Sequence, residues 1–317
     1  MILTLPMAKA IKDHLPDVKV FFLGREYIRA VVDACIYADG FIELSDFLKD
    51  DFLINGKKAN AIVHVKPLGS VASHAKKLKI KWRIGTTNRL YHWNTCNKLV
   101  KLSRKKSNLH EAQLNLKLLK PFGIIKEFSL EEIQSLYGLE KIRPLSKEYA
   151  HLLDNKKYNL ILHPKSRGSA REWGLHNFES LISLLDKSRY KIFISGTEAE
   201  KKLAKPLLDK VTSAVTDITG KMPLEDFISF IANCDGMVAC STGPLHIAAA
   251  LGNHALGIYA PLHDIRPQRW GPVGKNAEVF VVNRQCLDCY KNKMSCHCIQ
   301  EINPLIIKET LDRLNKK

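Results

Sequence analysis

The stretch DGMVACSTGPLHIAAALGN, from Asp235 to Asn253, predicts a buried strand, a short turn and a helix. A short apolar run precedes the turn, and apolar residues at helical spacing follow it. The turn contains Ser241, Thr242 and Gly243. Hydroxyl and backbone N–H groups at a helix N-terminus favour anions, so we expect a phosphate group here. His246 in the first turn fits the same role, although a histidine in an apolar helix is more often structural.

Similar short apolar runs alternate with amphipathic segments along the whole chain. Strands are predicted at residues 18–24, 60–65, 158–164, 190–196, 235–240 and 255–261. Because strands that alternate with helices form parallel sheets, the chain is expected to be α/β. The polar stretch from Tyr137 to Asn159 interrupts this alternation. We therefore expect two doubly wound domains, at 1–145 and 155–302, and a C-terminal helix at 303–317 that packs back across their boundary.

Composition restricts the class of protein. A chain of 317 residues, 45% hydrophobic and 26% charged, is long enough for two folded domains. Apolar runs stay well short of the roughly 18 to 20 residues that span a bilayer, and the pattern of a secretion signal is absent, so a cytoplasmic protein is expected. A net charge of +17 favours nucleic acid, phosphorylated sugars or an anionic membrane surface as partners. The densest basic run, Lys98 to Lys106, is most simply a solvated face, with docking on an anion as the alternative.

Ligands of doubly wound sheets bind where strands end and helices begin, which directs attention to two more loops. The loop after the strand at 158–164 carries Lys165, Ser166, Arg167 and Arg171, whose hydroxyl and guanidinium groups suit phosphate oxygens. The alternative to a phosphate-binding loop is an ordinary polar surface loop that binds no ligand. Glu200, one turn into a later helix, suits ribose hydroxyls, although first turns of helices favour acids in any case.

Five segments together resemble glycosyltransferase family 9, whose best-known members are the lipopolysaccharide heptosyltransferases. They are LTLPMAKAIKDHLPDVKVFFLGREY from Leu3, KWRIGTTNRLYHW from Lys81, HPKSRGSAREWGLHNFESLISLL from His163, GKMPLEDFISFIANCDGMVACSTGPLHIAAALG from Gly220, and IYAPLHDIRPQRWGPVG from Ile258. The resemblance implies a GT-B fold, in which two Rossmann-like domains hold the active site in the cleft between them. It also implies an inverting transfer that uses neither metal nor cofactor.

The resemblance further implies the substrates. The donor is a nucleotide diphosphate sugar, with an ADP-sugar favoured and heptose or a related sugar transferred. The acceptor is a lipopolysaccharide core or a similar anionic glycan, which allows peripheral contact with the inner face of the cytoplasmic membrane. Nucleic acid is not an expected partner.

Individual roles are carried over from the family to matching positions. The diphosphate contacts fall on Ser166, Arg171, Thr242, Gly243 and His246, and the ribose contact falls on Glu200. Met222 matches the position that packs on the base, and Arg83 falls in the acceptor-side segment, where an arginine after a strand would hold an anionic sugar. Ser241 stands where heptosyltransferases often have an acid, and Arg171 where many have a lysine, so the donor sugar stays open.

The family's general base is an aspartate in a Gly-Asp turn that would precede Met1. We therefore expect the first domain to lack its first strand, and the chain to bind nucleotide but transfer sugar slowly. Asp13, Asp17 and Asp33 do not follow predicted strands, so no catalytic base is assigned.

Four of the eight cysteines, Cys286, Cys289, Cys296 and Cys298, lie close together in the sequence. Zinc is an option, but the one-residue gap in the second pair favours reduced structural thiols. Two other functions stay open. A non-catalytic nucleotide-sugar binder would explain an absent base, and a basic nucleic-acid-binding protein would explain the charge, although no nucleic-acid-binding motif is recognised.

Overall fold

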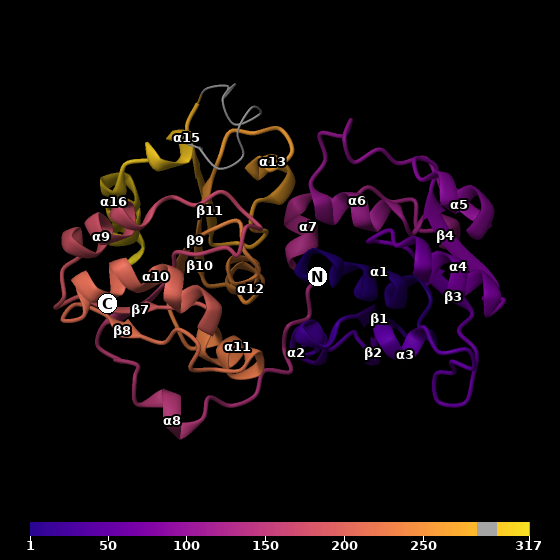
Figure 1. Cartoon of the computed structure of the whole chain (residues 1–317), viewed down its shortest axis with the longest axis horizontal. Helices are drawn as coiled ribbons and strands as arrows, with labels where there is room; N and C mark the ends of the chain where they lie inside the picture. Colours follow the sequence, from indigo (N-terminus) through magenta and orange to yellow (C-terminus); the bar gives the residue numbers. More distant parts are fainter. Residues whose placement is uncertain (284–296, 317) are drawn as a thin grey trace. The chain divides into compact units, whose positions relative to one another are not determined.

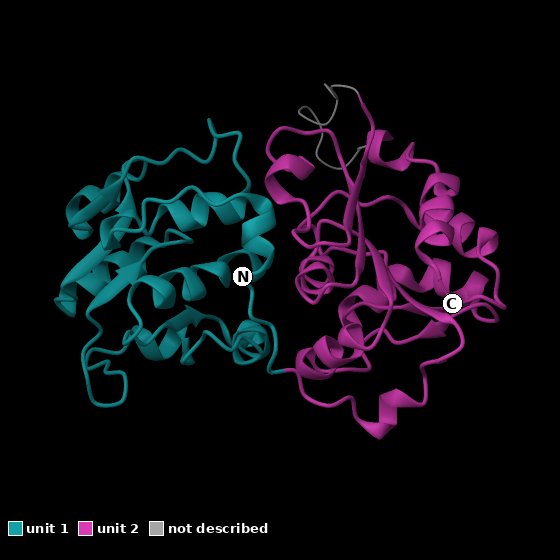
Figure 2. Cartoon of the chain, turned by 180° about the vertical axis from the view of Figure 1, so that it is seen from behind, with its two compact units in different colours: residues 1–141 teal, residues 142–317 magenta. Residues whose placement is uncertain are grey.

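The computed structural model describes residues 1–283 and 297–316, and the chain divides into two compact units (Figure 1 and Figure 2). Unit 1 is Met1–Lys141 and unit 2 is Ile142–Lys317. The division lies inside the polar connection that the sequence predicts. Both units alternate strands with helices, so the predicted α/β class is confirmed. Within the described residues, no helix is long and apolar enough to cross a bilayer.

Unit 1 contains two parallel sheets. β1 (Phe21–Gly24) pairs with β2 (Gly40–Glu43), and β3 (Ala61–Val63), β4 (Trp82–Thr86) and β5 (Lys98–Val100) pair in that order. A small core of Phe47, Val71, Ala75 and Ile80 packs against apolar residues of both sheets. The helices are η1 (Ile2–Thr4), α1 (Pro6–His14), η2 (Glu26–Ile28), α2 (Arg29–Asp33), α3 (Leu44–Phe47), α4 (Gly69–Lys77), α5 (Leu90–Thr95), α6 (Glu111–Lys117), η3 (Lys120–Phe122) and α7 (Leu130–Gln134).

Unit 2 is built on one six-stranded sheet in which all neighbours are parallel. Its order is β11-β10-β9-β6-β7-β8. The strands are β6 (Tyr158–His163), β7 (Tyr190–Ile194), β8 (Thr216–Asp217), β9 (Gly236–Cys240), β10 (His254–Tyr259) and β11 (Ala277–Val281). The helices are α8 (Lys147–Ala150), α9 (Leu175–Leu184), α10 (Glu198–Val211), α11 (Leu224–Ala232), α12 (Gly243–Ala250), α13 (Pro267–Trp270), α15 (His297–Gln300) and α16 (Pro304–Leu314).

The C-terminal helix α16 belongs to unit 2, where it packs against α9. Its inward residues Ile307 and Leu311 are fully buried, and the Tyr190 hydroxyl donates to Asp312 Oδ1 at 2.9 Å. Ile307 and Leu311 are covered within unit 2, where they join its main hydrophobic core. Packing of this helix across the domain boundary stays a prediction.

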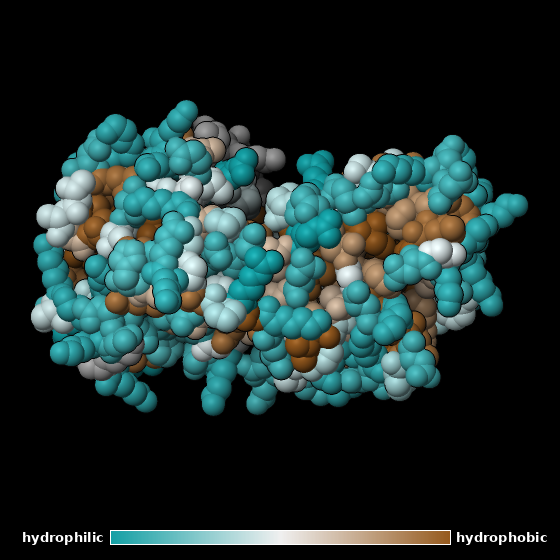
Figure 3. Space-filling view, turned by 90° about the horizontal axis from the view of Figure 1, so that it is seen from below, coloured by the Kyte–Doolittle hydropathy of each residue, from teal (hydrophilic) through white to brown (hydrophobic). Residues whose placement is uncertain are grey.

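Figure 3 shows one face of the molecule, on which most side chains are hydrophilic and apolar patches interrupt them. This pattern is ordinary for a folded chain with 26% charged residues, because polar atoms cannot cover the whole surface.

Candidate functional site

Neighbouring strands of unit 2 bring the predicted loops to one edge of the sheet. β6 lies between β9 and β7, with His163 opposite Ala239 and Leu162 opposite Ile194. Because all three strands are parallel, their carboxyl ends meet at one edge. β8, which precedes half-buried Met222, is the next strand along. The loops at this edge carry Lys165, Ser166, Arg167, Arg171, Glu200, Met222, Ser241, Thr242, Gly243 and His246.

The turn after β9 leaves polar groups without partners at the start of α12. Thr242 is the N-cap residue and is buried, but its hydroxyl makes no capping bond and has no partner in the described residues. The first backbone N–H groups of a helix also lack partners within it. A Cβ added to Gly243 would meet no atom within 4 Å, so the space in front of the helix is open. This end of α12 can receive an anion, and His246 lies buried in the same turn.

The loop after β6 is organised by a residue that sequence reasoning missed. Glu172 Oε1 accepts from the Ser166 backbone N–H at 3.0 Å and from its hydroxyl at 3.1 Å, and Lys165 forms an ion pair with the same carboxylate. The donors of Ser166 are thus occupied within the protein. The Nε of Arg171, by contrast, is buried and unpartnered in the described part of the chain. The sequence signal that could have identified Glu172 is an acid within a loop of three cations.

One cationic residue of the same loop, Arg167, has an unusual backbone conformation. Arg167 is exposed and adopts a left-handed conformation with φ of 50°, followed by Gly168 at φ of 77°. Residues in this region of φ are strained unless the surroundings hold them there. Arg167 is an exposed cation of this loop, and its role toward a ligand stays a prediction.

Glu200 has a structural role at the start of α10. Its Oε2 accepts from the Thr197 backbone N–H at 2.7 Å and from the Thr197 hydroxyl at 2.9 Å, and the side chain is only 3% exposed. This is a capping box at the start of α10, which matches the simpler of the two interpretations. The ribose contact remains a prediction.

A buried histidine, also missed from the sequence, lies under this edge. His163 ends β6, and its Nδ1 lies 2.9 Å from Ser195 Oγ at the end of β7. Burial lowers the pKa of His163, so its imidazole is neutral at physiological pH. The positive charge available to a ligand here therefore comes from the lysine and arginines of the loops.

Arg83 is not placed as the sequence predicts. It is the second residue of β4 rather than a residue after the strand, and its guanidinium donates to the carbonyls of Thr95 and Ile80. The predicted position after a strand is therefore wrong, while the contact of Arg83 with an anionic sugar stays a prediction. Close packing explains why position 85 of the same strand is a glycine, because a Cβ on Gly85 would lie 2.7 Å from Cys96 Sγ and from His92 Nδ1.

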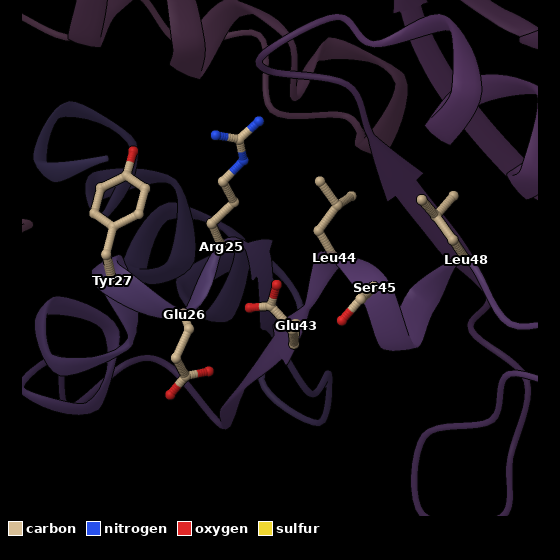
Figure 4. Close-up of a pocket in the computed structure, with 7 residues that line it drawn as sticks. All are labelled: Arg25, Glu26, Tyr27, Glu43, Leu44, Ser45 and Leu48. Atoms are coloured by element: carbon tan, nitrogen blue, oxygen red, sulfur yellow. The ribbon is translucent and has the colours of Figure 1, made fainter.

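Unit 1 has a groove where β1 and β2 end, which the sequence reasoning did not identify. Its volume is about 510 Å³, and Figure 4 shows Arg25 and Tyr27 pointing to the same side of it. One carboxylate oxygen of Glu43, Oε2, is buried and unpartnered in the described residues. A guanidinium beside an aromatic ring suits an anionic sugar. The lining residues are Arg25, Glu26, Tyr27, Glu43, Leu44, Ser45 and Leu48.

The zinc hypothesis is not tested by this structure. Cys286, Cys289 and Cys296 lie outside the described residues, while Cys298 is buried. In the parts of the chain that are described, no group of three or more His, Cys, Asp or Glu side chains could hold a metal ion.

Comparison with known proteins agrees with this arrangement. Residues 54–300 match glycosyltransferase family 9 (heptosyltransferase). A putative glycosyltransferase of Haemophilus influenzae is 25% identical over 287 residues, covering 84% of this chain and 81% of the relative. The structure of Escherichia coli ADP-heptose lps heptosyltransferase II has a TM-score of 0.75 at 16% identity, covering 99% and 94% of the two chains. The structure of E. coli heptosyltransferase WaaC with ADP has a TM-score of 0.69 at 17% identity, covering 99% and 95%.

These matches confirm the GT-B fold and the glycosyltransferase class that the sequence predicts. The family match spans most of both units and includes every predicted donor loop. The chain belongs to glycosyltransferase family 9.

Proposed function

We propose that the chain transfers heptose or a related sugar from an ADP-sugar to a lipopolysaccharide core or a similar anionic glycan. The observation that carries the proposal is the buried, unpartnered hydroxyl of Thr242 at the N-terminus of α12, at the same sheet edge as the unpartnered Nε of Arg171. Unpaired buried polar atoms are costly unless a ligand or water pairs with them. The heptosyltransferase relatives and the neighbour with ADP support the choice of donor.

The mechanism follows from where negative charge develops. The acceptor hydroxyl attacks the anomeric carbon from the face opposite the leaving diphosphate, which inverts the configuration. As the bond to the diphosphate breaks, charge grows on its oxygens. The start of α12, the guanidinium of Arg171 and the ring of His246 lie at the edge where this charge would be bound. Groups that bind the developing charge better than the ground state lower the barrier.

The acceptor side is assigned to unit 1. The groove beside Arg25 and Tyr27 offers a guanidinium, an aromatic ring and the unpartnered oxygen of Glu43. The guanidinium suits the carboxylate or phosphate of an anionic sugar, and the carboxylate oxygen can accept hydrogen bonds from sugar hydroxyls. The group that takes the proton from the acceptor hydroxyl stays unassigned. The proposal includes a cytoplasmic location and peripheral contact with the inner face of the membrane, where a lipid-linked acceptor is anchored.

Transfer is expected to proceed at the same rate with and without a chelator. The reason is that a helix N-terminus and cationic side chains supply the positive charge that a divalent cation supplies elsewhere. The measurement is release of ADP from ADP-heptose in the presence of a lipopolysaccharide core acceptor, with and without EDTA. A UDP-sugar serves as the control for recognition of the base. A rate that is lost on chelation and restored by magnesium or manganese would contradict the metal-independent mechanism.

A further inference from the structure

The positive charge of the chain is concentrated in one part of unit 1. Residues 52–110 contain 14 Lys and Arg residues and no Asp or Glu. The remaining residues contain 35 Lys and Arg residues against 32 Asp and Glu, so they are close to neutral. Nearly all of the +17 net charge therefore lies between β2 and α6. Ordinary solvation of a globular surface does not require such an uneven distribution.

Most of these cations point to solvent. They lie on and between β3, α4, β4, α5 and β5, which follow one another in this segment. Only some have an acidic partner from outside it, as Lys77 has in Asp50 at 2.7 Å and Arg104 in Glu111 at 2.6 Å. Six exposed cations of the segment are Lys66, Lys76, Lys79, Arg89, Lys101 and Lys105.

An apolar pair stands in the middle of this basic segment. Leu90 is 88% exposed, more than any other large apolar residue in the described chain, and Trp93 is 59% exposed. Both lie on α5, three residues apart, so they share one face of the helix while His92 and Thr95 are buried. The Trp93 indole N–H donates to the Thr87 carbonyl at 2.9 Å, which holds the ring in place. α5 packs against α4, which adds its own cations to the surface.

We propose that this surface, α4 and α5 with the basic residues of 52–110, docks on an anionic membrane. Lysines and arginines near an anionic bilayer are attracted to its headgroups, and leucine and tryptophan side chains enter the boundary between headgroups and acyl chains. A nucleic acid would satisfy the charge but not the exposed leucine, and so the lipid surface is favoured. The inference rests on the proposed function in one respect only, because a lipid-linked acceptor gives the enzyme a reason to bind the membrane.

The test is sedimentation of the full chain with vesicles. Vesicles of phosphatidylethanolamine and phosphatidylglycerol are compared with vesicles of phosphatidylcholine alone, at low and high salt. We expect binding to the anionic vesicles only, and weaker binding at high salt because the charges are screened. Leu90→Ser should weaken binding about tenfold, and each of Arg89→Gln and Lys76→Gln about fivefold. Leu203→Ser, at a 55% exposed leucine on α10, is the matched control and should bind as the wild type does.

Two outcomes would overturn the inference. One is equal binding to both kinds of vesicle, or binding that falls in Leu203→Ser as much as in Leu90→Ser. The other is tighter binding to a single-stranded RNA that displaces the vesicles and is unaffected by Leu90→Ser, which would identify a nucleic-acid surface. Because Leu90 lies in unit 1, outside the donor loops, ADP binding of the Leu90→Ser variant should be unchanged. ADP binding and vesicle binding can therefore fail separately, which distinguishes this inference from the proposed function.

Discussion

Replacing Trp173 with alanine is expected to lower the free energy of unfolding of unit 2 by about 3 to 5 kcal/mol. Trp173 is fully buried, and its ring contacts Phe178 edge-on at 5.0 Å between centroids. Its indole N–H donates to the Ile302 carbonyl at 2.9 Å, which ties the donor loop to the segment before α16. The substitution removes a large apolar side chain and leaves that buried carbonyl without its donor.

Calorimetry of thermal unfolding is the measurement for Trp173→Ala, because it can resolve the transitions of two units. Trp93→Ala, at a 59% exposed tryptophan of unit 1, is the matched control and should change the unit 2 transition little. A loss below about 1 kcal/mol in Trp173→Ala, which is the scale of an ordinary surface change, would show that the ring is not part of the core.

Acidification is expected to destabilise unit 1 through His64, at the carboxyl end of β3. Burial, and secondly the neighbouring His92, lowers the pKa of His64 from 6.5 to about 4. The two rings lie 5.5 Å apart between centroids, and burial also lowers the pKa of His92. Between about pH 6.5 and pH 4, His64 is therefore protonated in the unfolded chain and largely neutral in the folded chain. The free energy of unfolding should therefore be independent of this group above about pH 7 and fall by about 3 kcal/mol as the pH drops to 4.

The pH dependence is measured by urea unfolding at a series of pH values. His64→Leu should flatten the acid limb of the curve, because no group at that position then takes up a proton on unfolding. His176→Gln, at an exposed histidine of unit 2, is the control and should leave the limb unchanged. An acid limb that is equally steep in His64→Leu would show that other groups cause it.

Strands with a continuous apolar run were predictable from the sequence, and short or interrupted strands were not. All six predicted strands are present, since each has a continuous apolar run. β4 was missed because Arg83 interrupts its apolar pattern, and β8 because it has only two residues. β11 is half exposed at the edge of its sheet, so it lacks the apolar run of a central strand.

The location of the donor loops was predictable, while the contacts of their side chains were not. Parallel topology alone brings the loops after β6, β7 and β9 together, and this follows from strand order. What each side chain binds depends on partners that spacing does not reveal. Glu172 accepts hydrogen bonds from the N–H and the hydroxyl of Ser166, and the Thr197 N–H donates to an oxygen of Glu200. The hydrogen bonds from Arg83 to backbone carbonyls are likewise contacts that sequence spacing does not reveal.

The central claim is that the turn from Ser241 to Gly243 binds the diphosphate of the donor, and titration calorimetry with ADP tests it most directly. We predict saturable binding to the wild type, and binding about 1 to 3 kcal/mol weaker in Thr242→Val, the range for a hydrogen bond to a charged group. Because the Thr242 hydroxyl has no partner in the described residues, its loss should not lower the melting temperature of the ligand-free protein. Thr212→Val, at an exposed threonine, is the control. Unchanged ADP affinity in Thr242→Val, or no ADP binding by the wild type, would contradict the claim.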